Sequence, residues 1–390
     1  MLLYNTTFSF VVLSNYYITL MNNPKLHTLA ILFASFIILK TTAGQTNNAD
    51  ENDNNIDFSK YDVSCYCSVV GTSPTRILKL DNNGDIVLQL INGKTGKEIT
   101  IKYNQSQLEL LREFRLLKHE DDIWKTNFPV LGETRTLKLR DEASQTAEKL
   151  GGELNEDVVA LVKALSSLDR EKNTYTILFS YVLDDLVWRK FMKHGYMEER
   201  SITAEKPLWS GVIWAMYPPR KFSCGTNKVS DKGISININW TDKAIKNMMP
   251  FVSDWKSLMK MFDEYTKYSL VKDSEVRKVF DKFNLYDASG RFTVPVIVES
   301  KENILYNDCD VLADKVAESL FKYFNLSSFT KEFAFSSNEE ALVIFYHEFM
   351  WELLDYYERN GVIKKPVAFS NPDESLPEDI SDLVFIVRAE

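Results

Sequence analysis

The feature that most constrains this chain is an eleven-residue apolar run at residues 29–39, close to the N-terminus. A basic residue, Lys25, precedes the run, and the small residues 41–44 follow it. A basic region, a short apolar core and small residues are together typical of a secretory signal peptide. The run is too short to cross a bilayer as a helix, which takes about 20 apolar residues. The sequence therefore predicts export, with cleavage after Ala43 or Gly44.

The residues on either side of the apolar run also have expected roles. Residues 1–20 are largely apolar, contain no basic residue and precede a second methionine, Met21. We expect Met21 to be the true start, residues 1–20 to be a wrongly assigned extension and residues 21–44 to be the signal peptide. The alternative is that residues 1–39 form one long anchor. Residues 45–57 are almost all asparagine and acid, and we expect a disordered acidic linker there.

Charge and length limit the functions that are expected of the mature chain. Removal of residues 1–44 takes away two lysines and no acid, which leaves 44 basic against 55 acidic side chains. Such an acidic surface disfavours binding to phosphate backbones and to anionic membranes. We therefore expect no nucleic-acid partner and no stable membrane span after signal cleavage. The mature protein is expected in the periplasm, at the cell surface or secreted, and its length predicts two or three domains.

The first folded part is predicted to combine a small sheet with helices. Apolar stretches separated by turn-forming residues indicate a four-stranded antiparallel meander, with strands at residues 62–70, 76–80, 85–91 and 97–103. Helical periodicity follows from residue 105, and helices are expected at residues 136–150, 155–167 and 173–194. The first of these three should stop at Gly151-Gly152. Gly195 followed by apolar Tyr196 indicates a Schellman stop for the last.

The C-terminal part is predicted to be a mixture of helices and strands. Helices are expected in short pieces over 242–284, broken at Pro250, and at 304–324 and 338–359; strands are expected at 234–240, 291–298 and 382–388.

A helix that ends in glycine before a short apolar stretch is expected at 179–197 and again at 345–363. This similarity has two possible origins, a true internal repeat or the common way in which helices are capped by glycine. These helix-to-strand units resemble winged-helix modules at the level of fold only. We predict an α+β protein, with a meander-plus-helical domain at 58–204 and an α+β domain at 205–390.

Four cysteines allow two disulfides in an oxidising compartment. Cys65 and Cys67 lie two residues apart in a predicted strand, so both side chains point to one face. A bond between them would be strained, because their Cα atoms lie about 6.5 Å apart along a strand. Pairing with Cys224 or Cys309, or buried free thiols, is the expected arrangement. No second pair of ligands at metal-binding spacing follows, so we expect no metal.

The catalytic motifs that the sequence could contain are incomplete. His347-Glu348 begins like the zinc-protease motif H-E-x-x-H, but Trp351 stands where the second histidine is needed. Asp184 and Asp185 point about 100° apart on a helix, and Asp185 can reach Arg189 one turn later. The sequence has no nucleophile elbow, phosphate-binding loop or dinucleotide fingerprint, so no cofactor is expected. If the protein is a hydrolase, its weak catalytic candidates are Asp185, His347 and Glu348.

The best binding candidate is the segment 209–227, which brings Trp209, Trp214 and Tyr217 close to Arg220 in sequence. Aromatic faces beside polar groups hold apolar ligands and sugars, although both tryptophans could equally belong to the core. We therefore expect an exported, non-enzymatic protein that binds a protein partner or a small molecule such as a carbohydrate. The alternatives are an exported hydrolase with dispersed carboxylates and a metal, and a winged-helix-like regulator if the signal is misread.

Overall fold

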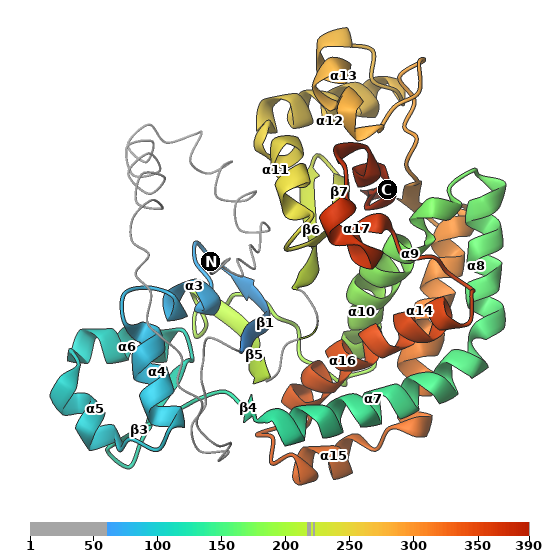
Figure 1. Cartoon of the computed structure of the whole chain (residues 1–390). Helices are drawn as coiled ribbons and strands as arrows, with labels where there is room; N and C mark the ends of the chain where they lie inside the picture. The colour runs from blue at the N-terminus through green and yellow to red at the C-terminus, as the bar shows by residue number, and fades with distance from the viewer. Residues whose placement is uncertain (1–60, 217–219, 221–222, 390) are drawn as a thin grey trace. The chain divides into compact units, whose positions relative to one another are not determined.

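The computed structural model describes residues 61–216, residue 220 and residues 223–389 (Figure 1). The predicted extension, signal peptide and linker over residues 1–57 lie outside these described residues, as does Tyr217. Among the helices that are described, none is long and apolar enough to cross a membrane.

The chain forms two compact units, and each unit draws on segments that are distant in sequence. The smaller unit contains the described residues up to Glu133 together with those of Arg200–Pro218. The larger unit contains Thr134–Glu199 and the described residues of Pro219–Glu390. These divisions differ from the expected boundary between residues 204 and 205.

A three-stranded sheet in the order β1-β5-β4 forms the base of the smaller unit. Its strands are β1 (Asp62–Val69), β5 (Trp209–Met216) and β4 (Val130–Leu131). β1 runs antiparallel to β5 in a register that pairs Cys65 with Ile213 and Cys67 with Gly211, and β4 runs parallel to β5. The expected first strand is thus confirmed, and its partner comes from the apolar run near residue 209.

The other three strands of the predicted meander are wrong, because their residues form helices: α3 (Pro74–Leu78), α4 (Asn83–Ile91) and α5 (Gly96–Lys102). Thr95 begins α5 with a capping box, in which its hydroxyl and the Glu98 carboxylate each accept from the other residue's backbone N–H. The alternating pattern over 97–103 was misleading because Ile99 is fully buried whereas Ile101 is 88% exposed. The exposed Ile101 therefore produced an alternation of apolar and polar residues that is typical of a strand, although the segment is a helix.

A hairpin completes the smaller unit. It follows α6 (Gln105–Glu113) and contains β2 (Leu117–Glu120) and β3 (Ile123–Thr126). Asp121 and Asp122 both adopt positive φ in its two-residue turn, which suits the right-handed twist of the strands. The helical periodicity that the sequence indicated from residue 105 therefore corresponds to a helix only as far as Glu113. Leu108, Leu111 and Trp124 pack into one apolar core of this unit.

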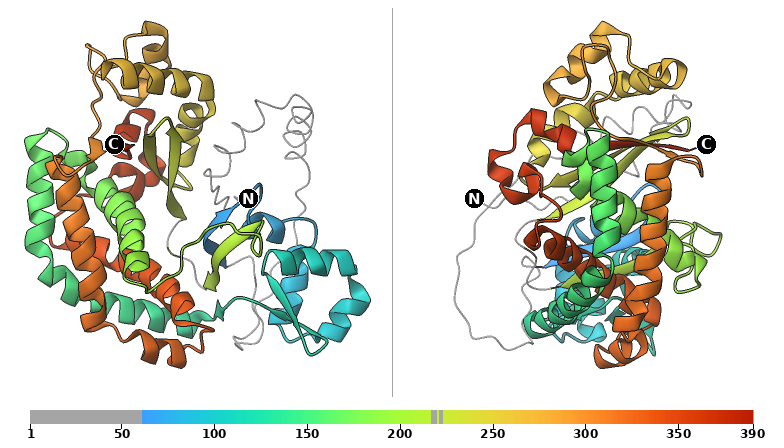
Figure 2. Two further views of the ribbon diagram at one scale, coloured as in Figure 1. Left: turned by 180° about the vertical axis from the view of Figure 1, so that it is seen from behind. Right: turned by 90° about the vertical axis from the view of Figure 1, so that its right-hand side faces the viewer.

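Long helices form much of the larger unit: α7 (Glu133–Glu153), α8 (Asn155–Ser167), a helix from Glu171 to Lys193, α14 (Ile304–Tyr323) and α16 (Asn338–Arg359). Figure 2 shows α8 and α14 side by side, as their contacts require. Helix α7 continues through Gly151-Gly152, where the sequence predicted a stop. Gly151 is buried there, and the Tyr357 hydroxyl of α16 donates to its carbonyl oxygen at 3.3 Å.

The helix from Glu171 to Lys193 changes its winding along its length. A 3₁₀ turn (Glu171–Asn173) and α9 (Thr174–Thr176) lead into a π-helical stretch, η4 (Ile177–Leu186), and α10 (Val187–Lys193) ends it. The predicted Schellman stop is confirmed: Gly195 has a φ of 74°, and the Tyr196 N–H donates to the Phe191 carbonyl at 2.9 Å. No regular strand follows directly, so the helix-to-strand prediction is wrong at this helix.

A mixed four-stranded sheet in the order β6-β7-β9-β8 also belongs to the larger unit. Its strands are β6 (Cys224–Asp231), β7 (Ile234–Thr241), β9 (Val384–Ala389) and β8 (Val296–Glu299). β6, β7 and β9 are antiparallel neighbours, whereas β8 runs parallel to β9. The strands predicted near 234, 291 and 382 are confirmed in their cores, whereas β6 was missed because its sequence is polar.

The remaining helices of the larger unit are α11 (Ile245–Ser253), α12 (Trp255–Tyr268), α13 (Ser274–Phe280), α15 (Leu326–Glu332) and α17 (Val367–Ser370). Pro250 lies inside α11 and does not break it, contrary to the prediction. Gly361 ends α16 with the same hydrogen-bond pattern as Gly195, again with no strand directly after it. The predicted α+β class is confirmed, with a small N-terminal sheet and a C-terminal mixed sheet among helices.

Candidate functional site

Asp185, the first hydrolase candidate, lies in a cluster of paired charges. Its carboxylate accepts from Arg189 twice, Nε to Oδ1 at 2.9 Å and Nη2 to Oδ2 at 2.6 Å. Arg189 also reaches Glu299, with Nη1 3.3 Å from Oε1, and the Tyr181 hydroxyl donates to the same Glu299 at 2.9 Å. Burial opposes the charge of Arg189, yet the two carboxylates raise its pKa. The predicted pair of Asp185 with Arg189 is confirmed, and both carboxylate oxygens of Asp185 are engaged by Arg189.

Glu348, the second candidate, is nearly buried and pairs with two arginines. Its side chain is only 4% exposed, and Oε2 accepts from Arg140 Nε at 2.9 Å and from Arg220 Nη2 at 2.7 Å. Arg220 also pairs with Glu352 at 2.9 Å. Although burial opposes its charge, the two glutamates raise the pKa of Arg220. This arrangement joins α7, the residue at 220 and α16 and favours a structural role for Glu348.

His347, the third candidate, faces a different set of neighbours. Its Nδ1 lies 2.7 Å from the Val343 carbonyl oxygen, one turn back along α16. Its ring packs on the buried Trp188 with 5.2 Å between ring centres, and the Trp188 indole donates to Asp184 at 3.2 Å. Trp188 thus contacts both His347 and Asp184. Within the described part of the chain, no group of three or more His, Cys, Asp or Glu residues could hold a metal.

The predicted aromatic binding segment is divided between the two units. Trp209 and Trp214 both lie on β5 and are only 3% and 5% exposed. Trp209 belongs to the apolar core of the smaller unit. Arg220 belongs to the larger unit, where it pairs with Glu348 and Glu352. The alternative interpretation, in which both tryptophans are core residues, agrees with this burial.

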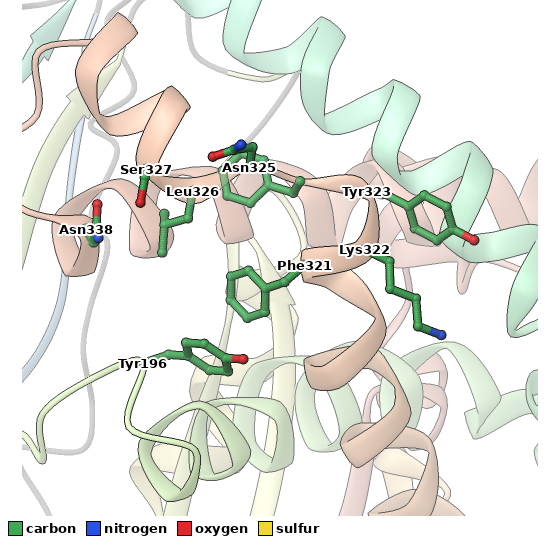
Figure 3. A pocket seen from close by; sticks show the side chains of 9 residues that line it. Tyr196, Phe321, Lys322, Tyr323, Asn325, Leu326, Ser327 and Asn338 are labelled. Carbon is green, nitrogen blue, oxygen red and sulfur yellow. The ribbon is translucent and has the colours of Figure 1, made fainter.

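A hollow of about 540 Å³ in the larger unit offers a more open site (Figure 3). It lies where α14 ends and α15 begins, close to the turn that follows α10. Its lining includes aromatic, aliphatic and amide side chains: Tyr196, Phe321, Leu326, Asn325, Ser327 and Asn338.

One wall of the hollow is aromatic. The Tyr196 and Phe321 rings lie next to each other in Figure 3, with centres 4.2 Å apart and planes tilted by 35°. The buried ring of Phe191 supports both, with centres 6.3 Å from Tyr196 and 6.0 Å from Phe321. Tyr196 is nevertheless 40% exposed. The Schellman turn at Gly195 therefore holds an aromatic ring at the surface against a rigid support.

Three uncharged polar side chains line the hollow on the side of Leu326: Asn325, which caps α15, Ser327 and Asn338. The Asn325 side-chain oxygen accepts from the Ser328 N–H at 3.0 Å, and the Asn338 oxygen accepts from the Thr330 hydroxyl at 2.8 Å. In the structure as described, neither side-chain amide nitrogen donates to a protein group. The Asn325 oxygen is thus held at the start of α15 and the Asn338 oxygen by the Thr330 side chain, and each amide nitrogen can donate to a ligand.

Lys322 and Tyr323 lie on the other side of the helix end and are held by Glu153. Figure 3 shows both side chains directed away from Tyr196. The Glu153 carboxylate accepts from Lys322, Tyr323 and Ser319, each at 2.7 Å. These hydrogen bonds, the one from Lys322 first, lower the pKa of Glu153 to about 2. The end of α14 is therefore fixed to the end of α7, which positions the residues of the hollow.

Sequence reasoning did not find this hollow. It recognised Tyr196 only as part of a helix stop, and Phe321 looks like an ordinary apolar residue near the end of a helix. The one available signal was a large aromatic residue directly after a Schellman glycine, because such a residue normally packs back on its own helix. Asn325-Leu326-Ser327 matches the acceptor pattern for N-glycosylation, but this pattern does not indicate a hollow.

The described cysteines also differ from the predicted disulfides. Cys65, Cys67, Cys224 and Cys309 are all free thiols. Cys65 and Cys67 lie in the smaller unit, whereas Cys224 and Cys309 lie in the larger one. Of the arrangements expected from sequence, free thiols are the one that the structure contains.

Comparison with known proteins identifies no relative of this chain: no protein-family model, no curated protein and no solved structure matches it.

Proposed function

We propose that this chain is an exported binding protein that holds a small polyhydroxylated ligand, such as a mono- or disaccharide, in the hollow beside Tyr196. The observation that carries the proposal is the exposed Tyr196 ring packed against Phe321. Sugars present C–H faces that pack on aromatic rings, and an exposed, rigid aromatic wall is suited to them.

The polar side of the hollow supports the same ligand class. The amide nitrogens of Asn325 and Asn338 and the Ser327 hydroxyl are the groups that recognise neutral hydroxyls. None of these three groups carries a charge, and the charged lining residue Lys322 is paired with Glu153 and directed away from Tyr196. A neutral ligand with many hydroxyls therefore matches the lining better than a phosphate or a carboxylate does.

The size of the hollow also fits a small ligand. Its volume of about 540 Å³ lies within the usual range for small-molecule sites, roughly 300–1,000 Å³. Because the hollow is open to solvent and small, we expect weak affinity, with a Kd on the order of 1 mM or about −4 kcal/mol.

The hydrolase alternative has less support. Asp185 and Glu348 are each paired with arginine, and Glu348 is almost completely buried. A general acid or base must reach a reacting group, and its pKa should lie near the working pH. The arginine partners also occupy carboxylate lone pairs that a general acid or base would need to reach a substrate.

The experiment is a binding screen of neutral mono- and disaccharides by ligand-observed NMR, followed by titration of any sugar that binds. Tyr196→Ala removes the aromatic wall and should weaken binding about tenfold, since stacking on one ring is worth about 1 kcal/mol or more. Tyr196→Phe keeps the ring and should bind nearly as well as the natural chain.

The matched control is Tyr268→Ala. Tyr268 is also in the larger unit and is 39% exposed, close to the 40% of Tyr196, but it does not line the hollow. Its loss should leave sugar binding unchanged. If no neutral sugar binds the natural chain, or if both alanine variants bind equally well, the proposed function is wrong.

A further inference from the structure

Cys65 and Cys67 form a close pair of thiols in the smaller unit. They project to the same face of β1, and their Sγ atoms are 3.5 Å apart, with Cys67 donating to Cys65. The Thr75 hydroxyl lies 3.5 Å from Cys65 Sγ. Both cysteines are only partly buried. A bond between the two sulfur atoms would close them from 3.5 Å to about 2 Å and would also require the strand to distort, because rotation about Cα–Cβ does not move the Cβ atoms.

The surroundings of the two sulfurs are unequal. The hydrogen bond from Cys67, supported by Thr75, lowers the pKa of Cys65 although burial opposes this. The pKa of Cys67 is raised because its thiol donates a hydrogen bond to Cys65 and because burial disfavours its thiolate. Cys65 is therefore the sulfur that ionises first, and Cys67 holds the remaining proton.

The strand opposite the pair approaches Cys67 closely. Gly211 of β5 pairs with Cys67 and has a φ of 150°. A Cβ atom at this position would lie 2.6 Å from Cys67 Cα and 2.7 Å from Cys67 Cβ. Only glycine fits there without displacing the cysteine, so the conformation of Cys67 depends on both strands.

We propose that Cys65 and Cys67 are a reversible dithiol–disulfide pair that exchanges with low-molecular-weight disulfides such as oxidised glutathione. The Cys65 thiolate attacks one sulfur of the small disulfide, forms a mixed disulfide and releases one small thiolate. Cys67 then loses its proton and attacks Cys65 Sγ, which forms the Cys65–Cys67 bond and releases the second small thiol. The two cysteines are oxidised by two electrons, and one small disulfide is reduced to two thiols.

The geometry of the strand explains why a disulfide between Cys65 and Cys67 would be reversible and not a permanent cross-link. Residues two apart on a strand have Cα atoms about 6.6 Å apart, near the upper limit for a disulfide. Bonds formed at such limits are strained and more easily reduced, which is typical of exchanging disulfides. This inference is independent of the proposed sugar site, because it concerns residues of the other unit.

The test uses the mature chain with Cys224→Ser and Cys309→Ser, so that only the pair remains. The reduced protein is equilibrated with oxidised glutathione, quenched with acid, alkylated after unfolding and analysed by mass spectrometry. We expect an intact protein lighter by two hydrogens, with neither cysteine alkylated and with the bond mapped to one peptide. Reduced glutathione in excess should restore both thiols.

A second variant tests the order of attack. With Cys67→Ser added, Cys65 should stop at a stable mixed disulfide with glutathione. With Cys65→Ser, glutathione should add to Cys67 more slowly than it adds to Cys65 in the Cys67→Ser chain, because burial still opposes the Cys67 thiolate whereas the Thr75 hydroxyl still supports the Cys65 thiolate. If the natural pair yields only mixed disulfides, linked dimers or unreacted thiols, the inference is overturned, whatever the single-cysteine variants do.

Discussion

At the scale of single residues, the clearest case is Glu348, a charge that the sequence presented as part of a broken metal motif. In the structure the same carboxylate is buried between Arg140 and Arg220. Burial of a charged side chain costs free energy unless an opposite charge pairs with it. Removal of one partner therefore leaves the remaining charges buried without compensation. The residue is therefore important for stability, and no sequence motif could show this because its partners lie 208 and 128 positions away.

Glu348→Gln should lower the free energy of unfolding by about 3 kcal/mol, since two partly buried arginines lose their shared countercharge. The matched control is Glu148→Gln, which breaks the pair of Glu148 with Arg359. That pair joins the same two helices, α7 and α16, but its side chains are 53% and 51% exposed. Exposed pairs contribute roughly 0–1 kcal/mol. Urea unfolding measures both, and equal losses would contradict the structural role of Glu348.

At the scale of elements, the long helices were predicted well and the short ones were not. The helix over 304–324 and the one over 338–359 repeat apolar residues over many turns, so their period was clear. Helices α3 to α5 have only five, nine and seven residues, and a short apolar run fits a strand equally well. The capping signals at Ser73 and Thr95 were present in the sequence and should have outweighed the apparent alternation.

Other features of the fold could not have been found from local sequence. β6 has a polar sequence, and it is a strand because β7 pairs with all eight of its residues. The π-helical stretch Ile177–Leu186 has the composition of an ordinary buried helix. The aromatic wall of the hollow joins Tyr196 to Phe321, residues on different elements that only tertiary packing brings together.

The glycine pair in α7 gives a prediction about one element. A Cβ atom on Gly151 would overlap the Tyr356 ring, with Cγ at 3.0 Å and two ring atoms closer still. Gly151→Ala should therefore destabilise the protein by about 1–3 kcal/mol through overpacking. At Gly152 the nearest atom would be the Tyr356 hydroxyl oxygen at 3.8 Å, which is ordinary contact.

Gly152→Ala should be neutral or stabilise the protein by roughly 0.5 kcal/mol, because alanine favours a helix more than glycine does. The two variants have the same chemistry at neighbouring positions, so thermal unfolding of both isolates the packing against Tyr356. A loss of stability in Gly152→Ala, or none in Gly151→Ala, would show that the helices do not approach each other closely at this point.

At the scale of the whole molecule, export is the proposal that decides where the protein acts. It depends on residues 21–44, which lie outside the described part of the chain. Its physical basis is the short apolar run and the small residues after it. Exposure to an oxidising compartment would also provide the disulfides with which Cys65 and Cys67 are proposed to exchange.

N-terminal sequencing of protein recovered outside the cytoplasm should find residue 44 or 45 at the start of the chain. Signal cleavage after Ala43 or Gly44 produces these ends. A variant with Phe33→Arg and Ile37→Arg should remain in the cell uncleaved, because two charges interrupt the apolar run. Soluble cytoplasmic protein that starts at Met1 or Met21 in the natural chain would contradict the export proposal.

The division of the smaller unit also affects how this chain can fold as the ribosome makes it. β1 is synthesised early, but β5, its hydrogen-bonding partner, follows only after all of Thr134–Glu199. Nascent domains generally fold in order from the N-terminus, whereas the smaller unit cannot form its sheet until β5 has been synthesised. During that interval the edge of β1 and its two thiols have no strand partner. The smaller unit can therefore be completed only after Thr134–Glu199 of the larger unit has been synthesised, and closing so long a loop makes its final step slow.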